Sequence, residues 1–336
     1  MSVILKRHLG RVVAGHRMTE DEAGEAMGAI MDGDATPAQI GGLLAAMSVR
    51  GEAEDEIVGF ARAMRSRGLP LRSTGAIDTC GTGGDGAGTF NISTVASLVV
   101  AGCGVPVAKH GNRAVSGSCG SADVLEQLGV RVDAPLETVQ RCLDEAGWAF
   151  LFAPAFHAST RHAAVPRREL GVRTVFNLLG PLTNPALPEA QVVGVPRPEL
   201  TELMARCLGR LGVRRAWVVY GAGIDELSPA APSRVTEWRD GAVRTFTIAA
   251  AEAGCAPCLV DELRGGDAAH NAAIARGVLA GEPGARREAV VLNAAAALLV
   301  AGRAADLAEG ARRAREALDS GAAASVLERV GGITRP

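Results

Sequence analysis

The sequence predicts an α/β protein with a small all-helical N-terminal domain and a larger α/β domain built on a mostly parallel central sheet. Two observations lead to this prediction. The first seventy residues show helical spacing of apolar residues and no β pattern. After Gly75 the pattern changes to short apolar runs, each followed by a loop and a helical stretch. With 336 residues, the chain is long enough for two domains.

Short helices with well-marked starts are expected in the N-terminal part. Thr19 followed by Glu22 is a capping-box pattern, and Thr36 followed by Gln39 is a second one with proline at the first helical position. Apolar residues from Ile40 to Met47 recur at i, i+3, i+4 and i+7, which predicts an amphipathic helix.

The later part of the chain contains apolar runs that predict strands. Their wide spacing leaves room for helical crossovers, so the sheet should be largely parallel. An Ala-rich stretch from Arg287 to Ala301 predicts a buried helix, and Leu307–Val330 predicts charged surface helices. The candidate strands are Val105–Ala108, Ala149–Ala153, Gln191–Val195 and Val213–Tyr220.

Composition excludes several classes of protein. The formal net charge of −2 argues against a partner held by bulk electrostatics, so any phosphate site must be local. Ala-rich runs are too interrupted by charge to cross a bilayer, and no signal peptide is evident. Seven scattered cysteines indicate reduced thiols and a cytoplasmic protein, with the Cys255–Cys258 pair read as coincidental.

A glycine-dense loop after Asp78-Thr79 carries the strongest functional signal. Glycines at 81, 83, 84, 86 and 88 let backbone N–H groups approach an anion. Asn91-Ile92-Ser93-Thr94 then starts an apolar helix, whose N-terminus adds unpaired donors. An ordinary glycine turn and simple helix capping are the plain alternatives, but together the two features predict a phosphate cradle.

Other unusual residues also follow strands, where ligands bind in open α/β sheets. Lys109, His110, Asn112 and Arg113 form a basic segment after Val105–Ala108. A solvated charged turn would be the ordinary explanation for such a segment, and single histidines such as His110 are more often structural. The position of the segment after a buried strand favours a ligand-binding role.

Adjacent carboxylates at Asp225 and Glu226 end another strand in a glycine-rich turn. Oxygen ligands of this kind suit Mg²⁺, which takes its remaining ligands from water and substrate phosphate. A surface acidic pair is the alternative. His157 follows a further strand, and Arg167 offers a guanidinium that could hold a carboxylate through two hydrogen bonds.

Six motifs in order resemble the anthranilate phosphoribosyltransferase family of tryptophan biosynthesis: GTGGD, NIST, KHGNRAVS, GSADVLE, RRELGVRTVFNLLGPLTNP and GIDELS. The match runs almost end to end, through Gly265–Ala268 and Leu292–Ala296. It implies a helical domain of residues 1–72, with about 165–188 packing against it, and an α/β domain of 73–164 and 189–336. It also implies an active site in the cleft between the domains and a homodimer formed through the helical domain.

The resemblance implies transfer of the phosphoribosyl group from 5-phosphoribosyl-1-diphosphate to the amine of anthranilate. The products would be N-(5-phosphoribosyl)anthranilate and diphosphate, in the second step of tryptophan biosynthesis from chorismate. Mg²⁺ would be held by Ser93, Asp225 and Glu226, and Lys109 would share the catalytic role with the two carboxylates. Anthranilate would contact Gly81, His110, Asn112, Arg167 and Gly180. The phosphoribosyl diphosphate would be bound by Gly81, Gly83, Gly84, Asp85, Thr89, Asn91, Ser93, Thr94, Lys109 and Ser121.

The reaction builds negative charge on the departing diphosphate, so its main demand is electrostatic. Anthranilate's amine is a weak base, and a strong general base such as His110 is not required. Four positions depart from the family pattern: Ser118, Cys119, Ala158 and Tyr220. Loss of a cation at 118 would weaken phosphate binding, and Ala158 in place of proline leaves the loop after His157 less rigid.

Two other functions remain open at this point. A pyrimidine nucleoside phosphorylase resembles this family in fold and also has a glycine-rich phosphate loop, but the carboxylate pair and NLLGPLTNP favour diphosphate and Mg²⁺. A non-enzymatic relative could instead bind nucleic acid. The near-neutral charge and the retained carboxylates argue against that function. No membrane partner is expected, because charges interrupt the Ala-rich runs.

Overall fold

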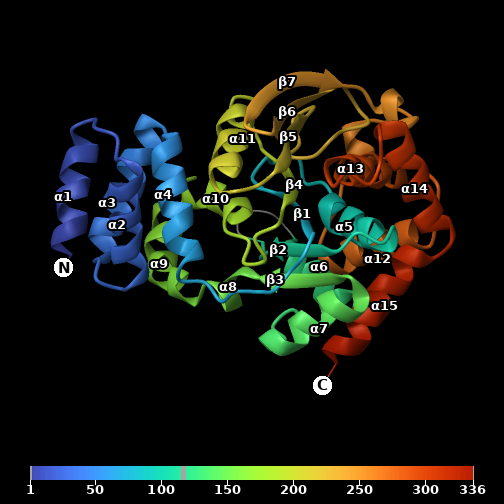
Figure 1. Ribbon diagram of the computed structural model, residues 1–336, viewed down its shortest axis with the longest axis horizontal. Coiled ribbons are helices and arrows are strands. Elements are labelled where there is room, and N and C mark those ends of the chain that lie inside the picture. Colours follow the sequence, from blue (N-terminus) through green and yellow to red (C-terminus); the bar gives the residue numbers. More distant parts are fainter. Residues whose placement is uncertain (1, 115–118, 336) are drawn as a thin grey trace. The chain divides into compact units, whose positions relative to one another are not determined.

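The computed structural model describes residues 2–114 and 119–335, which divide into two compact units (Figure 1). One unit contains the chain up to Pro70 together with Ala153–Pro185. The other contains Leu71–Phe152 and the chain from Ala186 onward. The first unit is helical and the second is α/β with a mostly parallel sheet, which confirms the predicted fold class.

The helical unit consists of helices from both of its chain segments. Helix α2 packs along α4, α1 packs on α3 and α2, and α9 packs on α3 and α2. Residues 153–164, which the sequence analysis assigned to the α/β domain, lie in this unit because they lead directly into α9. The elements are α1 (Val3–Val13), α2 (Glu20–Met31), α3 (Pro37–Arg50), α4 (Glu54–Arg65), α8 (Ala153–Phe156), η1 (Ala158–Thr160), α9 (Arg161–Leu170), α10 (Phe176–Leu179) and η2 (Gly180–Leu182).

Both predicted capping boxes are confirmed at the starts of α2 and α3. The backbone N–H of Glu22 donates to Thr19 Oγ1 at 3.3 Å, and the N–H of Thr19 donates back to the Glu22 carboxylate at 3.0 Å. Thr36 and Gln39 make the same reciprocal pair at 3.3 and 3.1 Å. These bonds satisfy donors that a helix start otherwise leaves unpaired.

A seven-stranded sheet forms the centre of the α/β unit, in the order β3-β2-β1-β4-β5-β6-β7. The first five strands in this order pair in parallel, and β6 and β7 continue antiparallel at one edge. The strands are β1 (Ile77–Gly81), β2 (Val107–Gly111), β3 (Trp148–Phe152), β4 (Ala190–Gly194), β5 (Arg215–Gly221), β6 (Ser233–Arg239) and β7 (Ala242–Ile248).

All four expected strands are present, with ends shifted by one to three residues. One detail of the expectation was wrong, because Lys109 and His110 lie inside β2 rather than in a loop after it. Asp78 and Thr79, which lead into the glycine loop as expected, lie inside β1, a strand that the sequence did not predict. All four side chains are buried, so the sheet accommodates polar groups where the sequence pattern did not predict a strand.

Helices cover the sheet of the α/β unit. Helix α5 packs on β1 and β2, α13 packs on β4, β5 and α5, and α11 packs on β5 and β6. Helices α14 and α15 both contact α5, and Figure 1 shows them as the red outer layer of this unit. The helices are α5 (Ile92–Gly102), α6 (Ser121–Gln127), α7 (Leu136–Ala146), α11 (Leu200–Arg210), α12 (Ala268–Leu279), α13 (Ala285–Val300), α14 (Leu307–Asp319) and α15 (Ala322–Thr334), with short turns η3 (Ala250–Ala253) and η4 (Val260–Leu263).

Helix α13 is the buried helix that the sequence predicted at Arg287–Ala301. Its residues from Ala289 to Leu298 are all buried, because alanines there let neighbouring helices approach closely. Across 2–114 and 119–335, every helix is too short or too polar to span a lipid bilayer.

Candidate active site

The carboxyl ends of three neighbouring strands, β1, β4 and β5, meet at one edge of the sheet in the α/β unit. Gly81 of β1 pairs with Gly194 of β4, and β5 ends nearby at Gly221. The glycine loop follows β1, and the turn that carries Asp225 and Glu226 follows β5. Parallel pairing therefore brings together segments that are more than a hundred residues apart in sequence.

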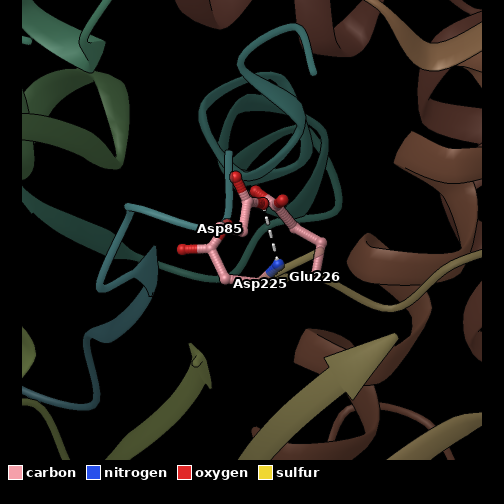
Figure 2. Close-up of side chains that lie close together, drawn as sticks. All are labelled: Asp85, Asp225 and Glu226. Atoms are coloured by element: carbon pink, nitrogen blue, oxygen red, sulfur yellow. Dashed lines mark hydrogen bonds between the residues drawn. The ribbon is translucent and has the colours of Figure 1, made fainter. Parts of the chain in front are cut away.

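Three carboxylates gather at this edge: Asp85 from the glycine loop, with Asp225 and Glu226 (Figure 2). One oxygen from each lies within 4.8 Å of the others. The backbone N–H of Asp225 donates to Asp85 Oδ2 at 3.1 Å, and the N–H of Gly83 donates to Asp225 Oδ2 at 2.7 Å. The loop and the turn thus hold each other through their own acidic side chains.

Burial changes the acidity of this cluster. It raises the pKa of Asp225 to about 7, with the negative charge of Asp85 as the second cause. Burial also raises the pKa of Glu226 well above its ordinary value, and the charges of Asp225 and Asp85 add to that effect. Carboxylates crowded in this way are poised to accept a cation, because a positive charge would relieve both the burial and the repulsion.

Lys109 lies beneath the cluster as a buried cation. Its Nζ donates to the carbonyl oxygen of Thr79 at 2.6 Å and to Ser93 Oγ at 3.4 Å. Burial lowers the pKa of Lys109, and the carboxylate of Asp78 opposes that change. The backbone N–H of Ser93 also reaches Glu226 Oε1 at 3.4 Å, so Ser93 lies between the lysine and the carboxylates.

The ends of β1 and β4 lie so close to Asp225 that both positions require glycine. A Cβ on Gly194 would lie 1.4 Å from the Asp225 carbonyl oxygen, and one on Gly81 would lie 2.2 Å from Asp225 Oδ2. Gly83 and Gly84 of the loop have φ of +68° and +77° and are exposed, as an anion-binding loop requires.

The start of α5 completes this side of the site. Asn91 is its N-cap residue, but the Asn91 side chain makes no capping hydrogen bond. Instead, Asn91 Oδ1 accepts from Asn271 Nδ2 at 3.0 Å, and its Nδ2 donates to the carbonyl oxygen of Cys119 at 3.3 Å. Helix α12 and the segment at Cys119 therefore both bond to the start of α5, and Thr89 precedes it half-buried.

The other predicted residues of the α/β unit lie after β2. His110 is buried in the strand, whereas Asn112 is exposed just beyond it. Ser121 begins α6, and its Oγ donates to the Asn112 carbonyl oxygen at 3.2 Å. Of the departures from the family pattern, Cys119 reaches Asn91 Oδ1 at 3.5 Å, while Ser118 lies outside the described residues.

Arg167 and Gly180 belong to the helical unit. Burial lowers the pKa of Arg167, and its guanidinium stacks 4.7 Å from the centre of the Phe176 ring. Gly180 is exposed at the junction of α10 and η2. His157 is buried in the same unit, with Nε2 2.8 Å from the Thr183 carbonyl oxygen, which indicates a structural role.

Asp85, which the resemblance assigns to the phosphoribosyl diphosphate, lies with the two metal-binding candidates. Sequence reasoning missed two further residues. Asn271 and Asn293 bond to site segments, although both come from helices far along the chain. An asparagine buried in an Ala-rich helix is a usable signal, because a buried amide requires partners.

Comparisons with known proteins agree with this geometry. Residues 73–324 match the model of the glycosyl transferase family a/b domain, and residues 6–68 match its helical bundle domain. The chain is 55% identical over 328 residues to anthranilate phosphoribosyltransferase of Moorella thermoacetica, covering 97% of each chain.

Solved structures give the same result. Anthranilate phosphoribosyltransferase from Thermus thermophilus is 46% identical, with a TM-score of 0.92 over 98% of this chain and 99% of that one. The enzyme from Saccharomyces cerevisiae, in complex with PRPP and Mg, is 26% identical, with a TM-score of 0.90 over 99% and 98%. The chain therefore belongs to the anthranilate phosphoribosyltransferase family of glycosyltransferase enzymes.

Proposed function

We propose that this enzyme transfers the 5-phosphoribosyl group from 5-phosphoribosyl-1-diphosphate to the amine of anthranilate. The products are N-(5-phosphoribosyl)anthranilate and diphosphate, and the reaction is the second step of tryptophan biosynthesis from chorismate. The observation that carries this proposal is the carboxylate cluster above a buried lysine and beside an exposed glycine loop, in a chain of this family.

Mg²⁺ is the proposed cofactor, and the residues present fit it. Asp85, Asp225 and Glu226 offer hard oxygen ligands within 4.8 Å of one another, which suits this ion. The yeast relative is described in complex with PRPP and Mg. When bound, Mg²⁺ would neutralise charge that develops on the departing diphosphate. Ser93 is proposed to complete the site.

Diphosphate binding is assigned to groups that meet around the glycine loop. The positive end of α5 presents a fixed partial charge to an anion, and we assign Gly81, Gly83 and Gly84 of the adjoining glycine loop to the same ligand. Lys109 adds a full positive charge whose position is fixed by its hydrogen bonds. We assign the remaining contacts to Asp85, Thr89, Asn91, Ser93, Thr94 and Ser121.

Anthranilate is proposed to contact Gly81, His110, Asn112, Arg167 and Gly180. A guanidinium is suited to the substrate carboxylate because it can donate two parallel hydrogen bonds. The substrate's aromatic amine is a weak base that loses its proton readily once the C–N bond forms. The chemistry therefore depends on positioning and charge neutralisation, and His110 is not assigned as a base.

The test incubates the protein with anthranilate, phosphoribosyl diphosphate and Mg²⁺. Consumption of anthranilate is measured through the loss of its fluorescence. We expect consumption that requires both additions and releases one diphosphate per anthranilate. Folded protein that leaves anthranilate unchanged would refute the proposal. Phosphate-dependent cleavage of thymidine or uridine would instead assign the protein as a nucleoside phosphorylase.

We also propose that the enzyme acts as a cytoplasmic homodimer formed through its helical unit. Three valines of that unit, Val3, Val13 and Val49, are 79%, 69% and 91% exposed, which is unusual for apolar side chains on paired helices. Light scattering during size-exclusion chromatography should give twice the chain mass of 34.4 kDa. A single-chain mass at working concentration would contradict this part of the proposal.

A further inference from the structure

We propose that Asn293 of helix α13 is a positioning residue that fixes the metal-binding turn of Asp225 and Glu226. The inference rests on the proposed function, since it assigns these carboxylates to the metal. Asn293 lies 66 residues beyond Leu227 in sequence, and its amide bonds directly to the residue that follows the carboxylate pair.

The contact between Asn293 and Leu227 has two hydrogen bonds. Asn293 Oδ1 accepts from the backbone N–H of Leu227 at 3.0 Å, and its Nδ2 donates to the Leu227 carbonyl oxygen at 2.9 Å. A side-chain amide carries one acceptor and two donors, so it can take the place of a neighbouring strand. Leu227 therefore has both of its backbone groups satisfied by one side chain.

The amide itself is held in place. Its second N–H donates to the carbonyl oxygen of Ala289, one turn earlier in α13, at 2.9 Å. Asn293 is 5% exposed on a helix whose central residues are buried against β4, β5 and α5. Because its three hydrogen-bonding groups are all used, neither rotation nor exchange of the amide orientation keeps the same bonds.

The other side of the turn is fixed independently. Gly221 and Ile224 exchange two backbone hydrogen bonds of 3.0 Å, and the N–H of Ser228 donates to Ser233 Oγ at 3.0 Å. Asn293 supplies the bonds between these two anchors. It also lines a small cavity together with Ser93, Asp225 and Glu226, so it lies close to the cluster that it supports.

Repulsion among the carboxylates explains why such support is needed. Asp85, Asp225 and Glu226 would move apart when they are deprotonated and no cation is bound, and re-forming the cluster would then weaken metal binding. A neutral amide restrains the turn without adding charge. Removing a group that orients metal ligands lowers metal affinity by about 10- to 100-fold in well-studied sites.

The experiment compares Asn293→Leu with Thr334→Val in the full-length protein. Thr334 is also 5% exposed in the same unit, and its Oγ1 accepts from Arg131 N–H and donates to the Val330 carbonyl oxygen, away from the carboxylates. Mn²⁺ binding in the presence of inorganic diphosphate is measured by loss of the free-ion EPR signal. We expect the Mn²⁺ dissociation constant to rise about tenfold in Asn293→Leu and less than twofold in Thr334→Val.

Equal Mn²⁺ affinity in the two variants would overturn the proposal, since lost stability alone would then explain Asn293. Should Asn293→Leu fail to fold, hydrogen exchange in the metal-free wild type decides the matter. Slow exchange of the Leu227 amide hydrogen supports the proposed hydrogen bonds from Asn293. Exchange at the rate of an open loop refutes them. Wild-type turnover of anthranilate is recorded separately, so failure of the proposed function is distinguishable from failure of this inference.

Discussion

We expect Asp225, a proposed metal ligand, to couple metal binding to pH. Burial raises its pKa to about 7, so the folded protein favours the protonated carboxyl. The stabilisation from this group is complete below the carboxyl's ordinary pKa and is lost as pH rises through about 7. In the proposed site Mg²⁺ would bind the deprotonated carboxylate, so we expect low pH to oppose its binding.

We expect Mg²⁺ with diphosphate to raise the melting temperature more at pH 8 than at pH 6. Differential scanning fluorimetry measures the increase at each pH. In Asp225→Asn the increase in melting temperature should differ less between pH 8 and pH 6, because the titrating carboxyl group is absent. An equal increase at both pH values in the wild type would contradict this role of Asp225.

Replacing both carboxylates of the Asp225–Glu226 pair by amides should abolish activity while the protein still folds. We expect Asp225→Asn with Glu226→Gln to lose at least about 100-fold in turnover at any Mg²⁺ concentration, because the ligands become neutral. Because both replacements nearly match the size of the carboxyl groups and add no charge to a buried site, the circular dichroism spectrum should not change. Wild-type rates at limiting Mg²⁺ would show that the metal binds elsewhere.

Arg167 offers a test of the assigned anthranilate contacts. Arg167→Ala should raise KM for anthranilate about tenfold and KM for phosphoribosyl diphosphate much less, because only the former would lose an ion pair. The neighbouring Arg168→Ala, at an exposed position of α9, is the matched control. A larger effect on the diphosphate substrate would reject the assignment.

At the scale of the secondary-structure elements, the end of β4 can pack against the turn after β5 only because a glycine lies there. Gly194→Ala would place a methyl group 1.4 Å from the Asp225 carbonyl oxygen, so the turn must move. We expect a loss of stability of ~3 kcal/mol and weaker Mg²⁺ activation. Gly10→Ala, in helix α1 with no atom within 4 Å of the new Cβ, should instead stabilise by about 0.5–1 kcal/mol. Chemical denaturation compares the two variants, and similar effects would contradict the packing argument.

The sequence predicted elements well where local rules determine them. Capping boxes, apolar periodicity and apolar runs identified α2, α3, α13 and four parallel strands. Strands β6 and β7 were missed because they form an edge hairpin with many charged or exposed residues, such as Arg234 and Arg239, which lack a clear apolar run. β1 was missed because its polar Asp78 and Thr79 are buried by tertiary contacts.

At the scale of the whole molecule, the sequence predicted the kinds of residue in the site but not their partners. Asp225, Glu226 and the glycine loop were proposed from their positions after strands, and Lys109 was proposed in the same way although it lies inside β2. The strand order that joins Asp85 to Asp225, and the bonds from Asn271 and Asn293, depend on long-range packing. Pairings of this kind leave no local periodicity in the sequence, so reading neighbouring residues cannot reveal them.

The division of the chain into units has a consequence for synthesis on the ribosome. The helical unit is closed only by Ala153–Pro185, and the centre of the sheet only by β4, at Ala190–Gly194. Helices α2 and α3 and strand β1 therefore emerge while α9, which packs on both helices, and β4, which pairs with β1, are still untranslated. Neither unit can be completed until more than half of the protein has left the exit tunnel, so the nascent chain depends on protection from aggregation until then.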